Sequence, residues 1–91
     1  MQLIDAILLL KTTDEAELFL HDLCTPHELN ALAERWRVCN LLDQQLLSYR
    51  AIQQETGASL GTITRISRFL KKEQHQGYRL ILNKINNINP Q

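Results

Sequence analysis

The chain has 91 residues with ten basic and ten acidic side chains, so its formal net charge is zero at pH 7. A chain of this length supplies one small domain, here residues 1–91, and oligomerisation is a natural way for it to bury more apolar surface. Aromatic residues, glycines and prolines are few, which favours an all-helical fold over a sheet-rich one. Two cysteines are too few for a disulfide framework or a zinc site, and they indicate a reducing compartment.

The first apolar run, Leu3–Leu10, predicts a helix that is apolar on most of its surface. Such a helix must be covered, either by its own domain or by a second subunit. The run is too short to span a membrane, Asp5 interrupts it, and it lacks the basic leader of a signal peptide. We therefore expect a soluble, cytoplasmic protein that does not engage a membrane.

Two capping boxes mark the starts of the next helices. Thr12 begins one, and Thr25 begins the other, with Pro26 at the first helical position, where no backbone N–H is needed. The second of these helices extends to about Gln44 and carries two apolar stripes. One stripe consists of Leu29, Leu32, Trp36 and Cys39, and the other of Val38, Leu41 and Leu42. Two stripes predict a central helix packed on both sides, with a second protomer on one of them.

Residues 48–70 predict two short helices joined by a tight turn, as in a helix-turn-helix. Ser48 and Ser59 are suited to cap the two helices, and Gly57 lies where the first must stop, because glycine adopts the left-handed conformation without steric penalty. The apolar stripe of the second helix consists of Ile63, Ile66 and Leu70. An ordinary helical hairpin with a solvated basic face would show the same pattern.

The other face of the second helix has the composition that DNA recognition requires. It begins with Leu60, Gly61, Thr62 and Thr64 and continues with Arg65, Arg68, Lys71 and Lys72. Small and hydroxylic residues let a helix N-terminus approach base edges, and Arg and Lys reach phosphates. Residues 1–34 hold seven acids and one base, whereas residues 48–72 hold five bases and one acid. A neutral chain can therefore still present a basic face to DNA.

No motif for catalysis or metal binding is recognisable in the sequence. A polar link at 71–77 precedes a last helix that begins at Tyr78, and a polar tail occupies 86–91. The three histidines lack the spacing of metal ligands, and neither a glycine-rich phosphate loop nor a Ser, His and Asp nucleophile set is present. We therefore expect no catalytic residue, no metal and no cofactor.

Several segments together resemble the bacterial Trp repressor superfamily: residues 23–32, 35–38, 55–59 and 62–65. The segment Asp22–Thr25, which leads into the long central helix, and the turn Glu55–Ser59 are similar to the corresponding segments of its YerC/YecD subgroup. The family similarity covers about residues 23–70, and the subgroup similarity extends it to about 7–78. The resemblance implies about six helices in an intertwined homodimer, whose two helix-turn-helix units enter successive major grooves.

The resemblance also implies which residues face DNA: Tyr49, Arg50 and Gln53 on the first helix of the hairpin, and Leu60, Gly61, Thr62 and Thr64 on the second. Phosphate contacts that set affinity and its salt dependence are expected from Arg50, Arg68, Lys71 and Lys72. The predicted function is a sequence-specific transcriptional regulator, a repressor, that binds double-stranded DNA as a homodimer.

The family's tryptophan pocket is matched only in part. Arg35 and Arg65 match the two arginines that sandwich the indole, and Thr25 matches a residue near the amino group of the ligand. However, Ile66 stands in place of a glycine, and Phe69 stands in place of a serine. We hypothesise that these two side chains fill the pocket as a built-in corepressor, so that the protein does not bind tryptophan. A plain core role for both is compatible with this.

Two other functions remain open from the sequence. A helical protein-interaction module could reuse the fold without binding DNA, and the exposed position of Leu60, the zero net charge and the acidic first third favour it. A regulator with a non-tryptophan effector would need a cavity, which a sequence does not reveal.

Overall fold

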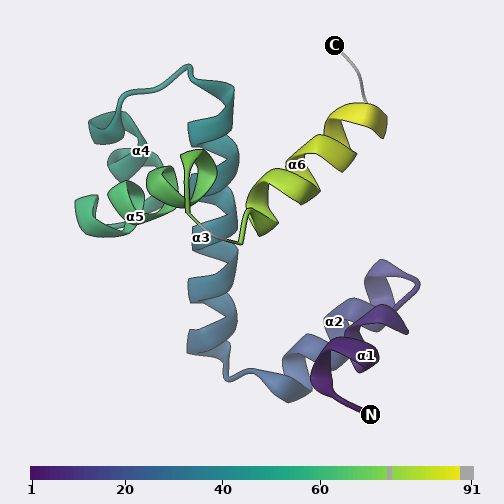
Figure 1. Ribbon diagram of the computed structural model, residues 1–91. Coiled ribbons are helices and arrows are strands. Elements are labelled where there is room, and N and C mark those ends of the chain that lie inside the picture. Colours follow the sequence, from purple (N-terminus) through teal and green to yellow (C-terminus); the bar gives the residue numbers. More distant parts are fainter. Residues whose placement is uncertain (74, 89–91) are drawn as a thin grey trace. The chain divides into compact units, whose positions relative to one another are not determined.

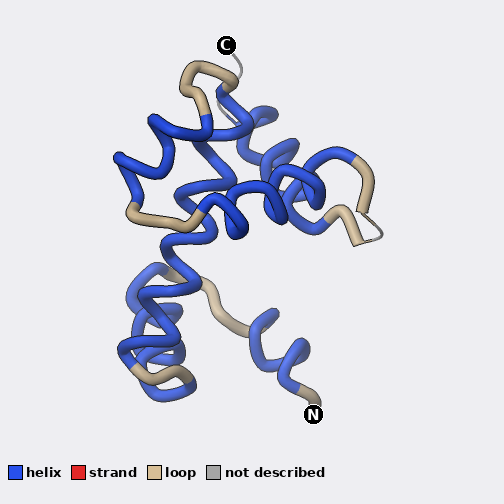
Figure 2. The backbone as a smooth tube through the Cα atoms, turned by 90° about the vertical axis from the view of Figure 1, so that its left-hand side faces the viewer, coloured by secondary structure: helices blue, strands red, loops and turns tan. Residues whose placement is uncertain are grey.

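The computed structural model describes residues 1–73 and 75–88. Within these residues the chain forms six α-helices and no strand (Figures 1 and 2). The helices are α1 (Leu3–Leu8), α2 (Thr13–Leu23), α3 (Pro26–Gln44), α4 (Tyr49–Thr56), α5 (Leu60–Lys71) and α6 (Gly77–Ile88). The all-helical prediction is confirmed. Helix α6 continues through the first part of the predicted polar tail, while residues 89–91 of that tail and residue 74 of the polar link lie outside the described residues.

The chain divides into two compact units, Met1–Leu32 and Ala33–Gln91. The first unit holds α1, α2 and the first turns of α3. The second holds the rest of α3 together with α4, α5 and α6, and all fully buried side chains of the described residues belong to it.

In the first unit, capping residues fix the helix starts as predicted. The Thr12 Oγ1 atom accepts the N–H of Glu15 at 3.1 Å, although the Glu15 carboxylate accepts the N–H of Lys11 rather than that of Thr12. Thr25 and Glu28 form a reciprocal box at 3.1 and 2.9 Å. The hydrogen bonds from Thr25 hold the pKa of Glu28 below its usual range, because they favour the ionised carboxylate.

The apolar side chains of the first unit lie largely on its surface. Helices α1 and α2 contain no buried residue, and large apolar side chains are exposed at Leu3, Ile4, Ile7, Leu8, Leu18 and Leu23. No helix in the described part of the chain is both long enough and apolar enough to cross a membrane.

The second unit is organised around a core to which each of its helices contributes. Helix α3 supplies Val38 and Cys39, helix α4 supplies Ile52, helix α6 supplies Leu82, and α5 supplies three side chains. The three residues from α5 are Ile63, Ile66 and Leu70, the stripe predicted from the sequence. In Figure 1, α4 and α5 lie on one side of the upper part of α3 and α6 lies on the other.

A half-buried ion pair joins the end of α3 to the start of α6. The Arg79 guanidinium of α6 donates to the Asp43 carboxylate near the end of α3 at 3.0 Å. Tyr78, the neighbour of Arg79, places its ring 6.4 Å from that of Trp36 on α3. These contacts fix the first turn of α6 against α3.

Cys39 should be unreactive in the native protein. It is fully buried, and this burial, together with the nearby Asp43 charge, raises the pKa of its thiol to about 11. Because the thiolate is the reactive form, iodoacetamide at pH 8 should modify the half-buried Cys24 first and leave Cys39 untouched until the protein unfolds. Peptide mass mapping checks this, and equal labelling of both cysteines in native protein would contradict it.

Candidate nucleic-acid interface

The predicted helix–turn–helix geometry is present in α4, α5 and the residues between them. Ser48 Oγ accepts the N–H of Ala51, and Ser59 Oγ accepts the N–H of Thr62, both at 3.1 Å. Gly57 ends α4 with a φ of +76°, a left-handed conformation that strains residues with a side chain. The turn therefore depends on two capping serines and a glycine, which can be recognised in the sequence.

Further contacts hold the turn rigidly on the core. The Thr56 hydroxyl donates to the carbonyl of Ile52 at 2.7 Å and accepts the N–H of Ala58 at 3.1 Å. Ile52 and Ala58 are buried with Ile63 of α5. As a result, α4 and α5 present their outer faces in a fixed relation to each other.

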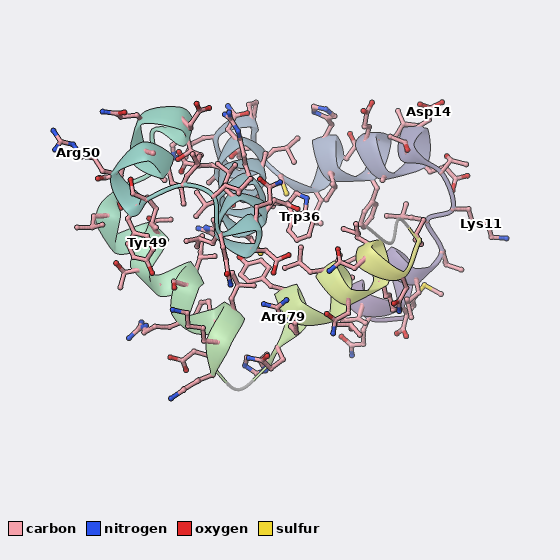
Figure 3. All side chains as sticks on the ribbon, turned by 90° about the horizontal axis from the view of Figure 1, so that it is seen from above. Lys11, Asp14, Trp36, Tyr49, Arg50 and Arg79 are labelled. Atoms are coloured by element: carbon pink, nitrogen blue, oxygen red, sulfur yellow. The ribbon has the colours of Figure 1, made fainter. Side chains whose placement is uncertain are left out.

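The residues predicted to face DNA fall into two groups. Those with exposed side chains or backbone are Tyr49, Arg50, Leu60, Gly61, Thr64, Arg68, Lys71 and Lys72. Arg50 extends away from α4 into solvent (Figure 3). Eight of the ten predicted residues are therefore exposed on the hairpin.

The other two predicted residues, Gln53 and Thr62, are half-buried, and the hydroxyls of Tyr49 and Thr62 form hydrogen bonds within the unit. The Tyr49 hydroxyl donates to the buried Ser67 Oγ at 2.7 Å, which ties α4 to α5. The Thr62 hydroxyl accepts from Ser59 Oγ at 3.0 Å, so it belongs to the cap of α5. Gln53 is half-buried on α4. The hydroxyls of Tyr49 and Thr62 thus help to position the hairpin, a role that is compatible with DNA contact by the same residues.

The basic charge of the hairpin is not neutralised by acids on its own surface. Glu55, the one acid of residues 48–72, pairs with Arg37 of α3 at 3.3 Å, and Glu73 lies 3.9 Å from Arg68. Among the described residues, no ion pair involves the remaining basic side chains of the hairpin: Arg50, Arg65, Lys71 and Lys72. A surface with such uncompensated cations attracts a polyanion.

Four of the five residues predicted for the altered corepressor pocket lie around one small cavity. The cavity measures about 130 Å³, and its lining is Arg35, Thr62, Arg65, Ile66, Phe69 and Tyr78. Ile66 is only 2% exposed, and the Arg65 guanidinium carbon lies 5.1 Å from the centre of the Phe69 ring, within the range of a cation–π contact. Thr25 instead caps α3 in the first unit.

Thr62 and Tyr78 also line this cavity, and neither was predicted to do so; Tyr78 was not predicted to have any site role. In the sequence, Tyr78 indicates only where the last helix starts, and this does not predict a role in a pocket. Its place in the pocket depends on how α6 folds back against α3, where its ring lies near Trp36.

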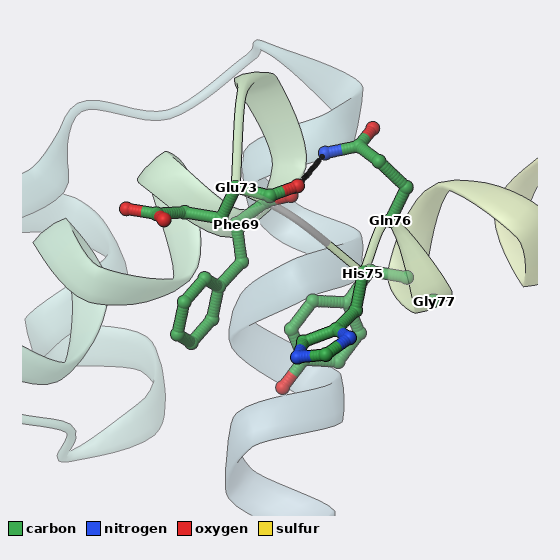
Figure 4. Close-up of a pocket in the computed structure, with 6 residues that line it drawn as sticks. Phe69, Glu73, His75, Gln76 and Gly77 are labelled. Atoms are coloured by element: carbon green, nitrogen blue, oxygen red, sulfur yellow. Dashed lines mark hydrogen bonds between the residues drawn. The ribbon is translucent and has the colours of Figure 1, made fainter.

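A second, larger pocket shares Phe69 and Tyr78 with this cavity. It has a volume of about 310 Å³ and is lined by Phe69, Glu73, His75, Gln76, Gly77 and Tyr78. The Gln76 side chain donates to the carbonyls of Phe69 and Glu73 at 3.0 and 2.8 Å, and the rings of Phe69 and His75 border the pocket (Figure 4). No cluster of His, Cys, Asp and Glu suited to a metal ion occurs within the described residues.

Comparison with known proteins gives consistent results. Residues 1–86 match the family model described as Trp repressor protein. The uncharacterized protein YerC of Bacillus subtilis (strain 168) is 38% identical over 84 residues, which cover 92% of this chain and 79% of YerC. A crystal structure of a TrpR-like protein from Eubacterium eligens ATCC 27750 is 38% identical, with a TM-score of 0.85 over 93% of this chain and 86% of the other. That of a candidate Trp repressor from Staphylococcus aureus is 39% identical, with a TM-score of 0.82 over 92% and 82% of the two chains.

Proposed function

This chain belongs to the Trp repressor family, and we propose that it is a sequence-specific regulator, a repressor, that binds double-stranded DNA through α4 and α5. One observation carries the proposal: a rigid helix-turn-helix exposes cations that no acid of the hairpin neutralises. The N-terminal turns of α5 would enter the major groove, while Arg50, Arg68, Lys71 and Lys72 would contact phosphates. Such a regulator acts on the chromosome, in the bacterial cytoplasm.

The proposed active form is a homodimer. Exposed apolar residues on α1 and α2 are matched by others on α6, namely Leu80, Ile81, Ile85 and Ile88. A stable monomer seldom leaves that much apolar surface in water. A two-fold dimer carries two recognition helices to half-sites one helical turn apart, so its operator is a palindrome.

Tryptophan is not expected to act as corepressor. The cavity beside Arg35 and Arg65 measures about 130 Å³, well below the roughly 300 Å³ at which ligand pockets usually begin. Ile66 and Phe69 occupy the adjoining space, and the Phe69 ring contacts the Arg65 guanidinium. We propose that these side chains hold α5 in its DNA-binding position without a ligand.

Calorimetry should therefore detect no heat of tryptophan binding at micromolar to millimolar concentrations. The double variant Ile66→Gly and Phe69→Ser restores the residue types of the family's pocket and provides the comparison. Saturable binding of tryptophan to the unmodified protein would overturn the built-in corepressor.

Selection from a random duplex pool tests the function as a whole. Purified protein should enrich one palindrome, and the enrichment should be equal with and without tryptophan. Enrichment that requires tryptophan would show that the pocket is open. If a well-folded dimer enriches no sequence, DNA recognition is wrong and the protein-interaction module takes its place.

The larger pocket favours a second candidate, a regulator that responds to a non-tryptophan effector. The volume of about 310 Å³ and the lining by Phe69, His75 and Tyr78 would suit a small, largely apolar molecule. Such a ligand would touch Phe69 at the end of α5 and could shift the recognition helix. Repeating the selection in a bacterial metabolite extract distinguishes the two candidates, because only this one predicts a change in enrichment.

A further inference from the structure

Leu60 occupies an unusual place for a large apolar side chain. It is the first residue of α5, directly after the Ser59 cap, and 52% of its surface is exposed. Single exposed leucines are common on proteins and by themselves mean little. This one, however, lies at the end of α5 that the proposed function directs toward base edges.

Gly61, the next residue, is not required by the packing of the chain. A Cβ atom at this position would meet only Ser59 Oγ, at 3.8 Å, and the φ of Gly61 lies in the ordinary range. Glycine is, after proline, the residue least favourable to a helix. Glycine therefore makes α5 less stable at this position than alanine would, and no packing contact within the chain requires it. The absence of a side chain leaves room for a bound macromolecule to approach the backbone.

The hydroxyl of Ser59 is already in use as both donor and acceptor, and the Thr62 hydroxyl accepts one hydrogen bond. Ser59 Oγ accepts the N–H of Thr62 at 3.1 Å and donates to the Thr62 hydroxyl at 3.0 Å. The first turn of α5 therefore presents an apolar side chain and a glycine, and the exposed hydroxyl of Thr64 follows one turn later. Hydrogen-bond readout by this turn is correspondingly limited.

Among the four bases, one offers an apolar group in the major groove, namely thymine with its C5 methyl. We propose that Leu60 recognises a thymine in each operator half-site through this methyl group, and that Gly61 allows α5 to approach closely enough for the contact. The inference rests on the proposed DNA-binding function and specifies what that function reads.

Deoxyuridine tests the contact directly, because it removes only the methyl group. In the selected palindrome, thymines are replaced one position at a time, symmetrically in both half-sites. At one position the affinity should fall about fourfold per half-site, or about fifteenfold for both, as expected for the loss of one buried methyl group. At that position Leu60→Ala should bind thymine and deoxyuridine equally well.

Leu46→Ala is the matched control. Leu46 is 80% exposed in the segment between α3 and α4, outside the hairpin, and its truncation should leave the discrimination intact. If the unmodified protein selects an operator yet binds every deoxyuridine duplex as well as the thymine duplex, the inference is wrong while the proposed function stands. If no operator is selected, the proposed function itself fails.

Gly61→Ala tests the close approach separately. This variant should melt at a higher temperature than the unmodified protein and bind the operator less tightly. Asn83→Ala is the control, because Asn83 is exposed on α6, outside the hairpin; it should leave operator affinity unchanged. Operator binding by Gly61→Ala that equals that of the unmodified protein would refute the role of the glycine.

Discussion

Replacing Ile81 with glutamate should convert the protein into a monomer and weaken operator binding by about a hundredfold or more. Ile81, Ile85 and Ile88 share one face of α6, and Ile81 is 44% exposed. If a second copy covers this face, the substitution buries an unpaired carboxylate, which is costly. A single helix-turn-helix then lacks the second half-site contact that makes binding tight. Sedimentation equilibrium and operator titration measure the two effects.

Asn83→Glu provides the matched control for this prediction. Asn83 is exposed on the same helix but lies off the isoleucine face, and the substitution adds the same charge. It should remain dimeric and bind the operator normally. If Ile81→Glu also stays dimeric at micromolar concentration, the two chains associate through another surface, and the proposed role of α6 is wrong.

Local features of the fold were predictable because short-range chemistry determines them. The caps at Ser48, Ser59 and Thr25 and the left-handed Gly57 appear where the sequence indicates. Each depends on a side chain that bonds to backbone within three residues, or on the conformational freedom of glycine. Helix ends and the turn of the hairpin therefore follow from the sequence almost without tertiary information.

Contacts between distant residues were not predictable in the same way. The Tyr49 hydroxyl bonds to Ser67, a contact that was not predicted, and Arg79 pairs with Asp43, 36 positions earlier in the chain. Both depend on how the helices pack, and a period of 3.6 residues says which face is apolar but not what lies against it. The place of Tyr78 in the small cavity was missed for the same reason.

At the altered corepressor pocket, the sequence predicted four of the residues around the small cavity but not the larger pocket beside it. The sequence indicates that Ile66 and Phe69 are larger than their family counterparts, and the structure places both around a cavity of about 130 Å³. The larger pocket, which shares Phe69 and Tyr78 with this cavity, depends on how the start of α6 lies against the end of α5 and on the Gln76 hydrogen bonds. No residue pattern in the sequence predicts this larger pocket.

Alanine at both Arg50 and Lys71 should reduce operator affinity roughly a hundred- to a thousandfold near 150 mM salt and flatten its salt dependence. Both side chains are exposed on the hairpin, and no carboxylate pairs with either among the described residues. In a dimer the variant lacks four cations, two from each protomer. Because each phosphate contact contributes about 0.9 to the slope of log K against log salt concentration, the slope should fall by about 3 to 4.

The same loss should appear on unrelated duplexes, since phosphates carry no sequence information. This separates the phosphate contacts from the readout by α5, where a substitution should change which sequence is preferred. Lys84→Ala is the control, because Lys84 is an exposed cation on α6, outside the hairpin, and its removal should leave the slope unchanged. A double variant that retains the original slope would mean that the basic face of α4 and α5 does not contact the phosphate backbone.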